Sequence, residues 1–199
     1  HQNLTINGGT LKNVELNLDP GTRLIATTST SNRLESVTIN GDLDLTTRFA
    51  VVRFKDVELN GTARLYRYGS IGFEGTQTLA GDATIEFQDN TGEFGMLEMV
   101  SAGTLTLAPS VLVHGGYGTI GGSRNWGAAM TLINQGTIRA DVSGRWLQVG
   151  DGARLSSLSN SGVIEAINGA TLYVRAPEVT NQAGARLSAP SGTLDIAGP

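Results

Sequence analysis

The sequence predicts an all-β fold, a single-stranded parallel β-helix (β-solenoid) of about nine coils with about 20 to 26 residues each. A glycine recurs at intervals of about 20 residues, at Gly21, Gly41, Gly61, Gly81 and Gly103. Polar and apolar residues alternate after each glycine, which is the period-two pattern of strands. The 199 residues include 27 glycines and 5 prolines, and no window has a sustained apolar pattern at helical spacing, so we expect almost no helix.

The first predicted strands lie in the segments 37–45, 57–65, 78–85 and 102–107, which align at offsets of 20, 20 and 22 residues because their glycines stand at 41, 61, 81 and 103. A strand with one apolar face can bury it against a copy of itself one coil later, so we expect parallel stacking. The alternation predicts burial of Leu43, Leu45, Leu65, Ile85, Leu105 and Leu107. It predicts exposure of Asp42, Asp44, Thr62 and Arg64.

The second half repeats the pattern in the segments 132–140, 158–166 and 179–187, where Asn134, Asn160 and Asn181 recur shortly before a glycine or alanine. Asparagine and glycine together suit tight turns, and asparagines stacked in successive coils can form hydrogen bonds along the axis. A second series begins at Gly152, Gly169 and Gly192. We therefore expect two or three strands in each coil.

We expect one β-helix domain over residues 1–199, with an irregular insertion or a widened coil at about 108–130. Both ends fall inside repeat text, which predicts a fragment of a longer protein. No run approaches the roughly 20 apolar residues of a membrane span, and the first residues do not resemble a signal peptide, so we expect no membrane insertion.

Composition argues against several classes of site. Cysteine is absent, so no disulfide, thiolate nucleophile or cysteine-bound metal is expected. No calcium-binding nonapeptide occurs, and we expect neither a metal nor a cofactor. The net charge is −4 and only Lys12 and Lys55 are lysines, so no basic surface for nucleic acid is expected.

Three phrases carry a resemblance to a known class of proteins: Asn-Gln-Gly-Thr-Ile-Arg-Ala (134–140), Asn-Ser-Gly-Val-Ile-Glu-Ala (160–166) and Asn-Gly-Ala-Thr-Leu-Tyr-Val (168–174). They resemble the degenerate repeats of filamentous-haemagglutinin-type adhesins and autotransporter passengers of bacteria. The resemblance covers most of residues 36–196 and is one of repeat style. It implies a right-handed β-helix, secretion or display on the bacterial surface, and a stalk or adhesive role, and it transfers no catalytic residues.

Asp42 and Asp44 are the only catalytic candidates that the pattern offers. They lie two residues apart on one strand face, which places them about 6.7 Å apart, within the range of a glycosidase carboxylate pair. The alternative is a structural role in solvation and in cross-coil ion pairs. Asp44 opposite Arg64 and Arg139 opposite Glu165 are the predicted ion pairs, each contributing a few tenths of a kcal/mol.

Binding candidates fall in two segments that concentrate rings and cations. Sugars stack on aromatic rings, and guanidinium groups bind hydroxyls or carboxylates, so both segments indicate a glycan site. The candidates are Arg53, Arg64, Tyr66, Arg67 and Tyr68 in the first segment and Tyr117, Arg124 and Trp126 in the second. The alternative is packing: Phe49, Phe54 and Phe73 would point inward and Trp126 would lie across the rod. His114 has no evident partner in the sequence.

These observations predict a structural or adhesive stalk module of a secreted or surface-displayed bacterial protein. Its expected partner is an extracellular glycan or the surface of a host or neighbouring cell. One alternative is a polysaccharide-binding or polysaccharide-degrading β-helix protein, although a non-enzymatic role is favoured. Another is a filament subunit, because exposed strand edges at the ends of a solenoid can associate end to end.

Overall fold

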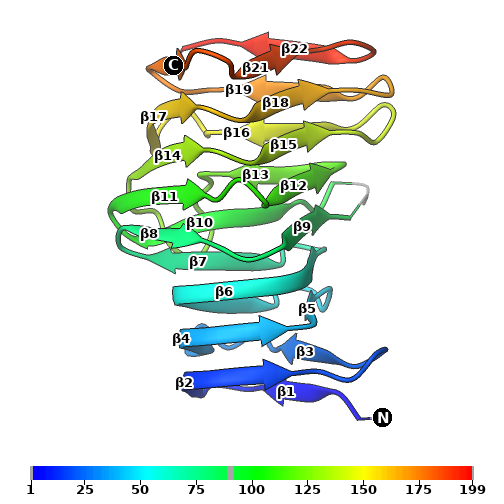
Figure 1. Ribbon diagram of the computed structural model, residues 1–199, viewed down its shortest axis with the longest axis vertical. Coiled ribbons are helices and arrows are strands. Elements are labelled where there is room, and N and C mark those ends of the chain that lie inside the picture. The colour runs from blue at the N-terminus through cyan, green and yellow to red at the C-terminus, as the bar shows by residue number, and fades with distance from the viewer. Residues whose placement is uncertain (1, 89–91, 199) are drawn as a thin grey trace.

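Parallel strands stack on one another along the whole length of the computed structural model, which describes residues 2–88 and 92–198 (Figure 1). They form a β-solenoid of about eight turns, and the described residues contain no helix. The predicted fold class is confirmed, and the predicted number of coils is close to the observed one.

Each coil passes through up to three parallel sheets. Sheet A contains β1 (Leu4–Ile6), β3 (Arg23–Ala26), β5 (Asp42–Leu45), the end of β6 (Val51–Leu65), β9 (Ala83–Phe87), β12 (Leu112–Gly115), β15 (Thr137–Ala140), β18 (Val163–Ala166) and β21 (Arg186–Ser188). Sheet B contains β2 (Thr10–Asn17), β4 (Arg33–Asn40), the start of β6, β7 (Ser70–Glu74), β10 (Gly95–Ser101), β13 (Tyr117–Ile120), β16 (Trp146–Val149), β19 (Thr171–Val174) and β22 (Thr193–Ile196). Sheet C contains β8 (Gln77–Leu79), β11 (Gly103–Leu107), β14 (Met130–Asn134), β17 (Leu155–Asn160) and β20 (Val179–Asn181).

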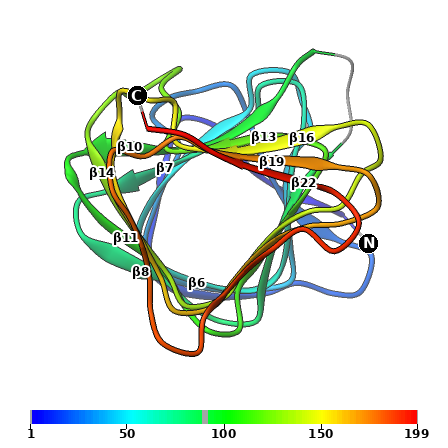
Figure 2. The ribbon, with the colours of Figure 1, turned by 90° about the horizontal axis from the view of Figure 1, so that it is seen from above.

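The coils at the N-terminal end have one short strand and one long strand, whereas later coils have three short ones. β2, β4 and β6 each bend at one residue with a left-handed backbone, at Asn13, Ser36 and Asp56, with φ between 52° and 54°. Beyond the last of these bends, Glu58 pairs with Ala80, next to β8. These strands therefore run into the position that sheet C occupies in later coils, and the walls enclose one interior when seen along the axis (Figure 2).

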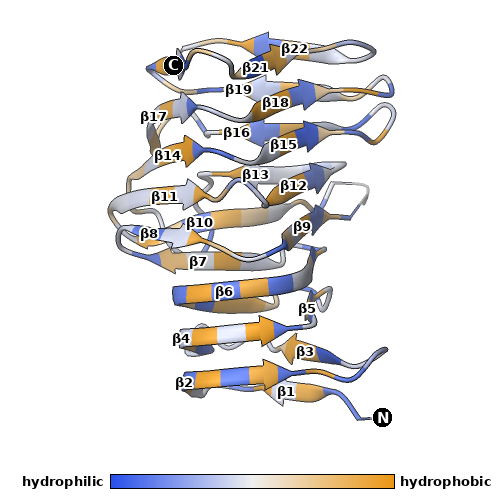
Figure 3. Ribbon diagram, viewed as in Figure 1, coloured by the Kyte–Doolittle hydropathy of each residue, from blue (hydrophilic) through white to orange (hydrophobic). Residues whose placement is uncertain are grey.

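Alternate residues of the strands fill this interior. The five leucines and one isoleucine predicted to be buried all have 0% exposure, so that prediction is confirmed. Phe54 and Phe73 also point inward, with their rings edge to face at 5.8 Å. The alternation of hydrophobic and hydrophilic positions is visible along β4 and β6 (Figure 3). Phe49 was predicted to be inside, and this is wrong: it is 38% exposed, in a turn between sheets A and B.

The residues predicted to be exposed face outward, but none is fully exposed. Asp44 is only 9% exposed, and Asp42, Thr62 and Arg64 are half-buried. Neighbouring coils lie about 4.8 Å apart, so the side chains of one outward column cover each other. The predicted exposure is therefore wrong for Asp44, which is buried, and correct only in part for Asp42, Thr62 and Arg64.

The alignment of the predicted strands was wrong at three glycines. Gly61 pairs with Ala83 rather than with Gly81, a shift of two residues that leaves each side chain on the predicted face. Gly103 opens β11, which stacks on β8 in sheet C, whereas β12 continues sheet A. Gly152 precedes a strand of sheet C, whereas the partner of Thr171 in β19 is Trp146. Strands of all three sheets need only one apolar face, so their sequences look alike.

The predicted asparagine ladder is confirmed. Asn134 Nδ2 donates to Asn160 Oδ1 (2.8 Å), and Asn160 Nδ2 donates to Asn181 Oδ1 (2.7 Å). A second ladder that was not predicted joins Asn17, Asn40 and Asn60 in the first coils, through bonds of 2.7 and 2.8 Å. The ladder that begins at Asn134 points inward, and Asn134 and Asn160 have 0% exposure. The ladder of Asn17, Asn40 and Asn60 lies on the outside, because these asparagines alternate with the inward-facing residues of their strands.

The interruption predicted at 108–130 is shorter than expected. Residues 112–115 and 117–120 are regular strands of sheets A and B. Only residues 121–129, hereafter the insertion, leave the coil before β14 begins at Met130.

Candidate functional site

Five aromatic rings form a continuous row on the outside of the solenoid, hereafter the ring row: Phe49, Tyr68, Phe94, Trp146 and Tyr117. Phe49 stacks on Tyr68 with centroids 5.5 Å apart, and Tyr68 meets Phe94 edge-on at 5.8 Å. Phe94 lies 5.7 Å from Trp146, which meets Tyr117 at 5.3 Å. The row follows the corner between sheets A and B across successive coils, although its members are far apart in the sequence.

Two of these rings stand at strained backbone positions. Phe49 (φ 67°) and Tyr68 (φ 68°) occupy the third position of the turns 47–50 and 66–69, and Arg67 (φ 49°) precedes Tyr68. A left-handed conformation costs a non-glycine residue about 1–2 kcal/mol. Strain of this kind is concentrated at functional sites, so the turns mark the ring row as a candidate.

The insertion folds back over the outer face of sheet B and is anchored there by Glu98. Glu98 Oε2 accepts hydrogen bonds from the backbone N–H groups of Arg124 (2.8 Å), Asn125 (2.9 Å) and Trp126 (2.9 Å). The Asn125 side chain donates to Ser70 Oγ at 2.7 Å. Consecutive N–H groups that converge on one oxygen form an anion-binding nest, here filled by a carboxylate with 0% exposure.

This anchoring holds Arg124 against the ring row. Its guanidinium carbon lies 4.4 Å from the ring centroid of Phe49 and 4.2 Å from that of Tyr68. Within residues 2–88 and 92–198, the guanidinium of Arg124 forms no ion pair. When a guanidinium stacks on a ring through its flat face, its N–H groups point sideways and remain able to donate hydrogen bonds to another group.

A cleft of about 480 Å³ opens beside the ring row and the insertion. Phe94 and Trp146 supply the aromatic part of its lining, and the insertion supplies Arg124. The other lining residues are Met96, Thr119, Gly122, Ser123, Gln148 and Asp151. Rings beside hydroxyl, amide and guanidinium groups are the combination that binds a ligand with both apolar faces and polar edges.

Trp126, a predicted binding residue, lies outside the lining of this cleft. Its ring covers Gly72 on the outer face of sheet B, where a Cβ atom would lie 2.3 Å from the Trp126 ring and 2.8 Å from Val100. This position fits the alternative in which Trp126 packs against the solenoid, and here its ring helps to fix the insertion to sheet B.

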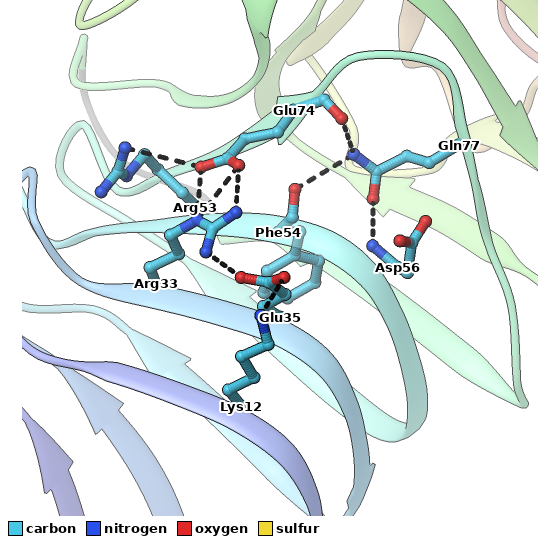
Figure 4. A network of polar contacts seen from close by, with 8 residues as sticks. All are labelled: Lys12, Arg33, Glu35, Arg53, Phe54, Asp56, Glu74 and Gln77. Atoms are coloured by element: carbon cyan, nitrogen blue, oxygen red, sulfur yellow. Dashed lines mark hydrogen bonds and ion pairs between the residues drawn. The ribbon is translucent and has the colours of Figure 1, made fainter.

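Arg53, another predicted binding residue, belongs to a charge network on sheet B of the first coils (Figure 4). Its Nη1 lies 3.5 Å from Glu74, which also receives Nε (2.9 Å) and Nη2 (2.7 Å) of Arg33. The hydrogen bonds from Arg33 hold the pKa of Glu74 below its ordinary value, although burial opposes this. Arg33 also contacts Glu35, which binds Lys12 at 2.8 Å.

Gln77 continues this region towards sheet C (Figure 4). Its Nε2 donates to the carbonyl oxygens of Phe54 and Glu74, both at 3.0 Å, and its Oε1 accepts from the N–H of Asp56 at 3.1 Å. These bonds satisfy the backbone at the bend of β6. The contacts of Gln77 thus join β8 to β6 and to the end of β7.

Asp42 and Asp44 are each bound by an arginine, but not by the predicted one. Asp44 stands opposite Arg64 in register, yet Arg64 pairs with Asp42 (2.6 Å) and Arg23 pairs with Asp44 (2.9 Å). Burial alone raises the pKa of both carboxyls, but hydrogen bonds from the arginines and from Thr62 or Thr46 outweigh it and hold both pKa values below normal. A general acid needs a raised pKa, so these contacts favour the structural role.

The predicted ion pair between Arg139 and Glu165 is confirmed, with Nε 2.7 Å from Oε1. His114 is not isolated, contrary to the sequence: its Nδ1 lies 2.9 Å from Asp141 Oδ2. His114, Asp141 and Tyr66 line a second cleft of about 580 Å³, together with Glu86, Phe87, Gln88, Gly115 and Val142.

The structure thus brings together Tyr68, Tyr117 and Arg124 from the predicted set, with Arg67 in the same turn as Tyr68. Arg67 lies 3.3 Å from Glu93, which also binds Arg48 at 2.7 Å. The sequence did not predict a role for Phe94, Glu98, Trp146, Gln148 or Asp151. Tyr117 directly follows Gly116, and Trp146 follows Gly144 by two residues. This similar position after a glycine is the one sequence feature that could have linked Trp146 to Tyr117.

Comparisons of the chain with protein-family models, curated proteins and solved structures gave no match. Among the residues that the structure describes, no helix has the length and apolar character of a membrane span. The same residues contain no cluster of three or more histidine, aspartate or glutamate side chains that could hold a metal ion.

Proposed function

We propose that this chain is a glycan-binding module, in which the solenoid serves as a rigid, stalk-like support for an adhesive surface. The observation that carries the proposal is the cleft lined by Phe94 and Trp146, with Arg124 fixed beside it. Secretion or display on a bacterial surface, as the repeat style implies, belongs to the same proposal.

The chemistry of the cleft suits a sugar better than a wholly apolar ligand. The apolar face of a sugar ring stacks on an aromatic side chain, and its hydroxyl groups need hydrogen-bond partners at the edges. Thr119, Ser123 and Gln148 offer hydroxyl and amide groups in the lining. The ring row also continues beyond the cleft, which favours an extended ligand that follows the axis.

Two alternatives from the sequence remain predictions. Degradation of a polysaccharide would need an acid and a base, and Asp42 and Asp44 are held in the ionised form by their partners. Association end to end into filaments is the other alternative. No contact described around the ring row and its cleft favours degradation or end-to-end association over glycan binding.

The test is a glycan array probed with the protein and with two variants. Trp146→Ala removes a ring from the cleft, whereas Tyr173→Ala removes a ring from β19, the next strand of sheet B, outside the cleft lining. Loss of a stacking contact of about 1.4 kcal/mol or more weakens binding at least tenfold.

We expect the protein and Tyr173→Ala to bind the same glycans and Trp146→Ala to bind them at least tenfold more weakly. A blank array, or equal loss in both variants, would contradict the proposal. Circular dichroism spectra of all three proteins check that the β-structure is retained.

A further inference from the structure

We propose that the cleft selects an anionic glycan, whose units carry a carboxylate or a sulfate, and that Arg124 is the residue that recognises the charge. This inference rests on the glycan-binding function proposed above and names its ligand class. Carboxylates and sulfates both accept two parallel hydrogen bonds from a guanidinium.

The charge around the ring row differs from that of the whole chain. The chain has a net charge of −4, yet three arginines contact rings of this row, namely Arg48, Arg124 and Arg145. A fourth, Arg67, lies in the same turn as Tyr68. Arg48 and Arg124 stack on Phe49, and Arg145 stacks on Tyr117 at 5.2 Å. Glu93 faces two of these arginines at once, with Arg48 and Arg67 as its partners.

Asp151, the carboxylate in the cleft lining, is engaged by the backbone. Its Oδ1 accepts from the N–H groups of Ala153 (2.9 Å) and Arg154 (2.7 Å), and Ser123 Oγ lies 3.4 Å from its Oδ2. It closes the turn before β17 and forms no ion pair with Arg124 within the described ranges 2–88 and 92–198. The cleft therefore contains a cation that its own acidic residue does not neutralise.

Arg33 provides a comparison, because its guanidinium donors are bound by a carboxylate of the protein itself. Three bonds of 2.7–3.1 Å join its Nε and Nη2 to Glu74. Arg124 is equally well held, by the Glu98 contacts of its backbone and by two rings, but its donors have no such partner among residues 2–88 and 92–198. An arginine fixed in advance loses little side-chain entropy when it binds an anion.

The experiment compares matched pairs of immobilised polysaccharides. One pair is a linear polyuronate and the same polymer with reduced carboxyl groups, and the other is a sulfated polymer and its desulfated form. The proteins are the unmodified chain, Arg124→Gln, Arg124→Lys and the control Arg154→Gln. Arg154 is an exposed arginine outside the cleft lining, so its replacement changes the net charge by the same amount.

We expect the unmodified chain and Arg154→Gln to bind at least one charged polymer about tenfold more tightly than its neutral form. Arg124→Gln should abolish this preference and Arg124→Lys should restore part of it. The two pairs tell a carboxylate ligand from a sulfate ligand. Thermal melts confirm that the variants fold.

Equal binding of charged and neutral polymers by the unmodified chain, or a preference that survives Arg124→Gln, would overturn this inference and leave glycan binding intact. If none of the polymers binds and the broad glycan array is also blank, the proposed function itself fails.

Discussion

The corner between sheets A and B contains two pairs of turns with nearly the same backbone and different residues. In turns 142–145 and 167–170, the left-handed positions are Gly144 (φ 69°), Asn168 (φ 56°) and Gly169 (φ 74°). Asparagine and glycine are the residues that such turns prefer. In turns 47–50 and 66–69, the same positions hold Phe49, Arg67 and Tyr68, with φ values of 67°, 49° and 68°.

The backbone geometry alone does not explain why turns 47–50 and 66–69, hereafter the aromatic turns, hold large side chains at left-handed positions. A glycine would satisfy the backbone at lower energy, since each left-handed non-glycine residue costs about 1–2 kcal/mol. The rings of Phe49 and Tyr68 form the aromatic surface against which the guanidinium of Arg124 packs, and this surface is its shelf. We infer that turns 47–50 and 66–69 are adapted to the binding surface, and that turns 142–145 and 167–170 are adapted to stability.

The largest effect is expected from Glu98→Ala, which would detach the insertion from the aromatic turns. Three backbone N–H groups lose a charged acceptor, and the local opening free energy should fall by about 3 kcal/mol. Hydrogen exchange should therefore become roughly a hundredfold faster at residues 124–126. Glu98→Gln, which keeps one acceptor oxygen, should give a smaller change. Unchanged exchange in Glu98→Ala would show that the insertion is held by other contacts.

Gly144→Ala tests the cost of a side chain in the glycine turns. A Cβ atom at Gly144 meets nothing within 4 Å, so only the backbone conformation opposes it. The free energy of unfolding should fall by about 1–2 kcal/mol in chemical denaturation. Gly9→Ala is the control, because it also meets no neighbour and has no left-handed φ. Equal stability of both variants would remove the energetic contrast between the two pairs of turns.

The smallest effect is expected from the charge network in the first coils, which we assign to stability alone. The pKa of Glu74 lies below its ordinary 4.5, so its ionised form stabilises the fold above that pH, and this contribution is lost as pH falls through the lowered pKa. Glu74→Gln should cost about 1 kcal/mol at neutral pH and reduce the loss of stability on acidification below about pH 4.5.

Denaturation at pH 7 and pH 3 measures this change, with the exposed Glu178→Gln as control. Glycan binding should be the same in Glu74→Gln as in the unmodified chain. An altered affinity would show that the network and the cleft are coupled.

The fold was predictable from the sequence because burial of one strand face imposes period-two alternation, as at Leu43 and Leu45. The asparagine ladder at Asn134 was predictable for the same local reason. The stacking partners of Gly103 and Gly152 were not, because the sheet to which a strand belongs depends on the lengths of the preceding loops. Phe49 was misplaced because a left-handed residue breaks the alternation on which the prediction relied.

The candidate site was predictable only in part. Tyr68, Tyr117 and Arg124 have side chains suited to glycans, and that much is visible in their residue types. Their meeting with Phe94 and Trp146 depends on which coils stack, which no local pattern states. Glu98 could not be recognised as an anchor because its partners are backbone N–H groups of a segment 26–28 residues later.

The most direct measurement is made on Phe49→Gly, with unfolding free energy and affinity for the glycan found on the array determined on the same preparation. We expect the stability to change by less than about 1 kcal/mol, because relief of backbone strain offsets the lost ring contact. The affinity should fall about tenfold, because Arg124 loses part of its shelf. A loss of several kcal/mol in stability with unchanged affinity would instead identify the ring row as packing and contradict its role in binding.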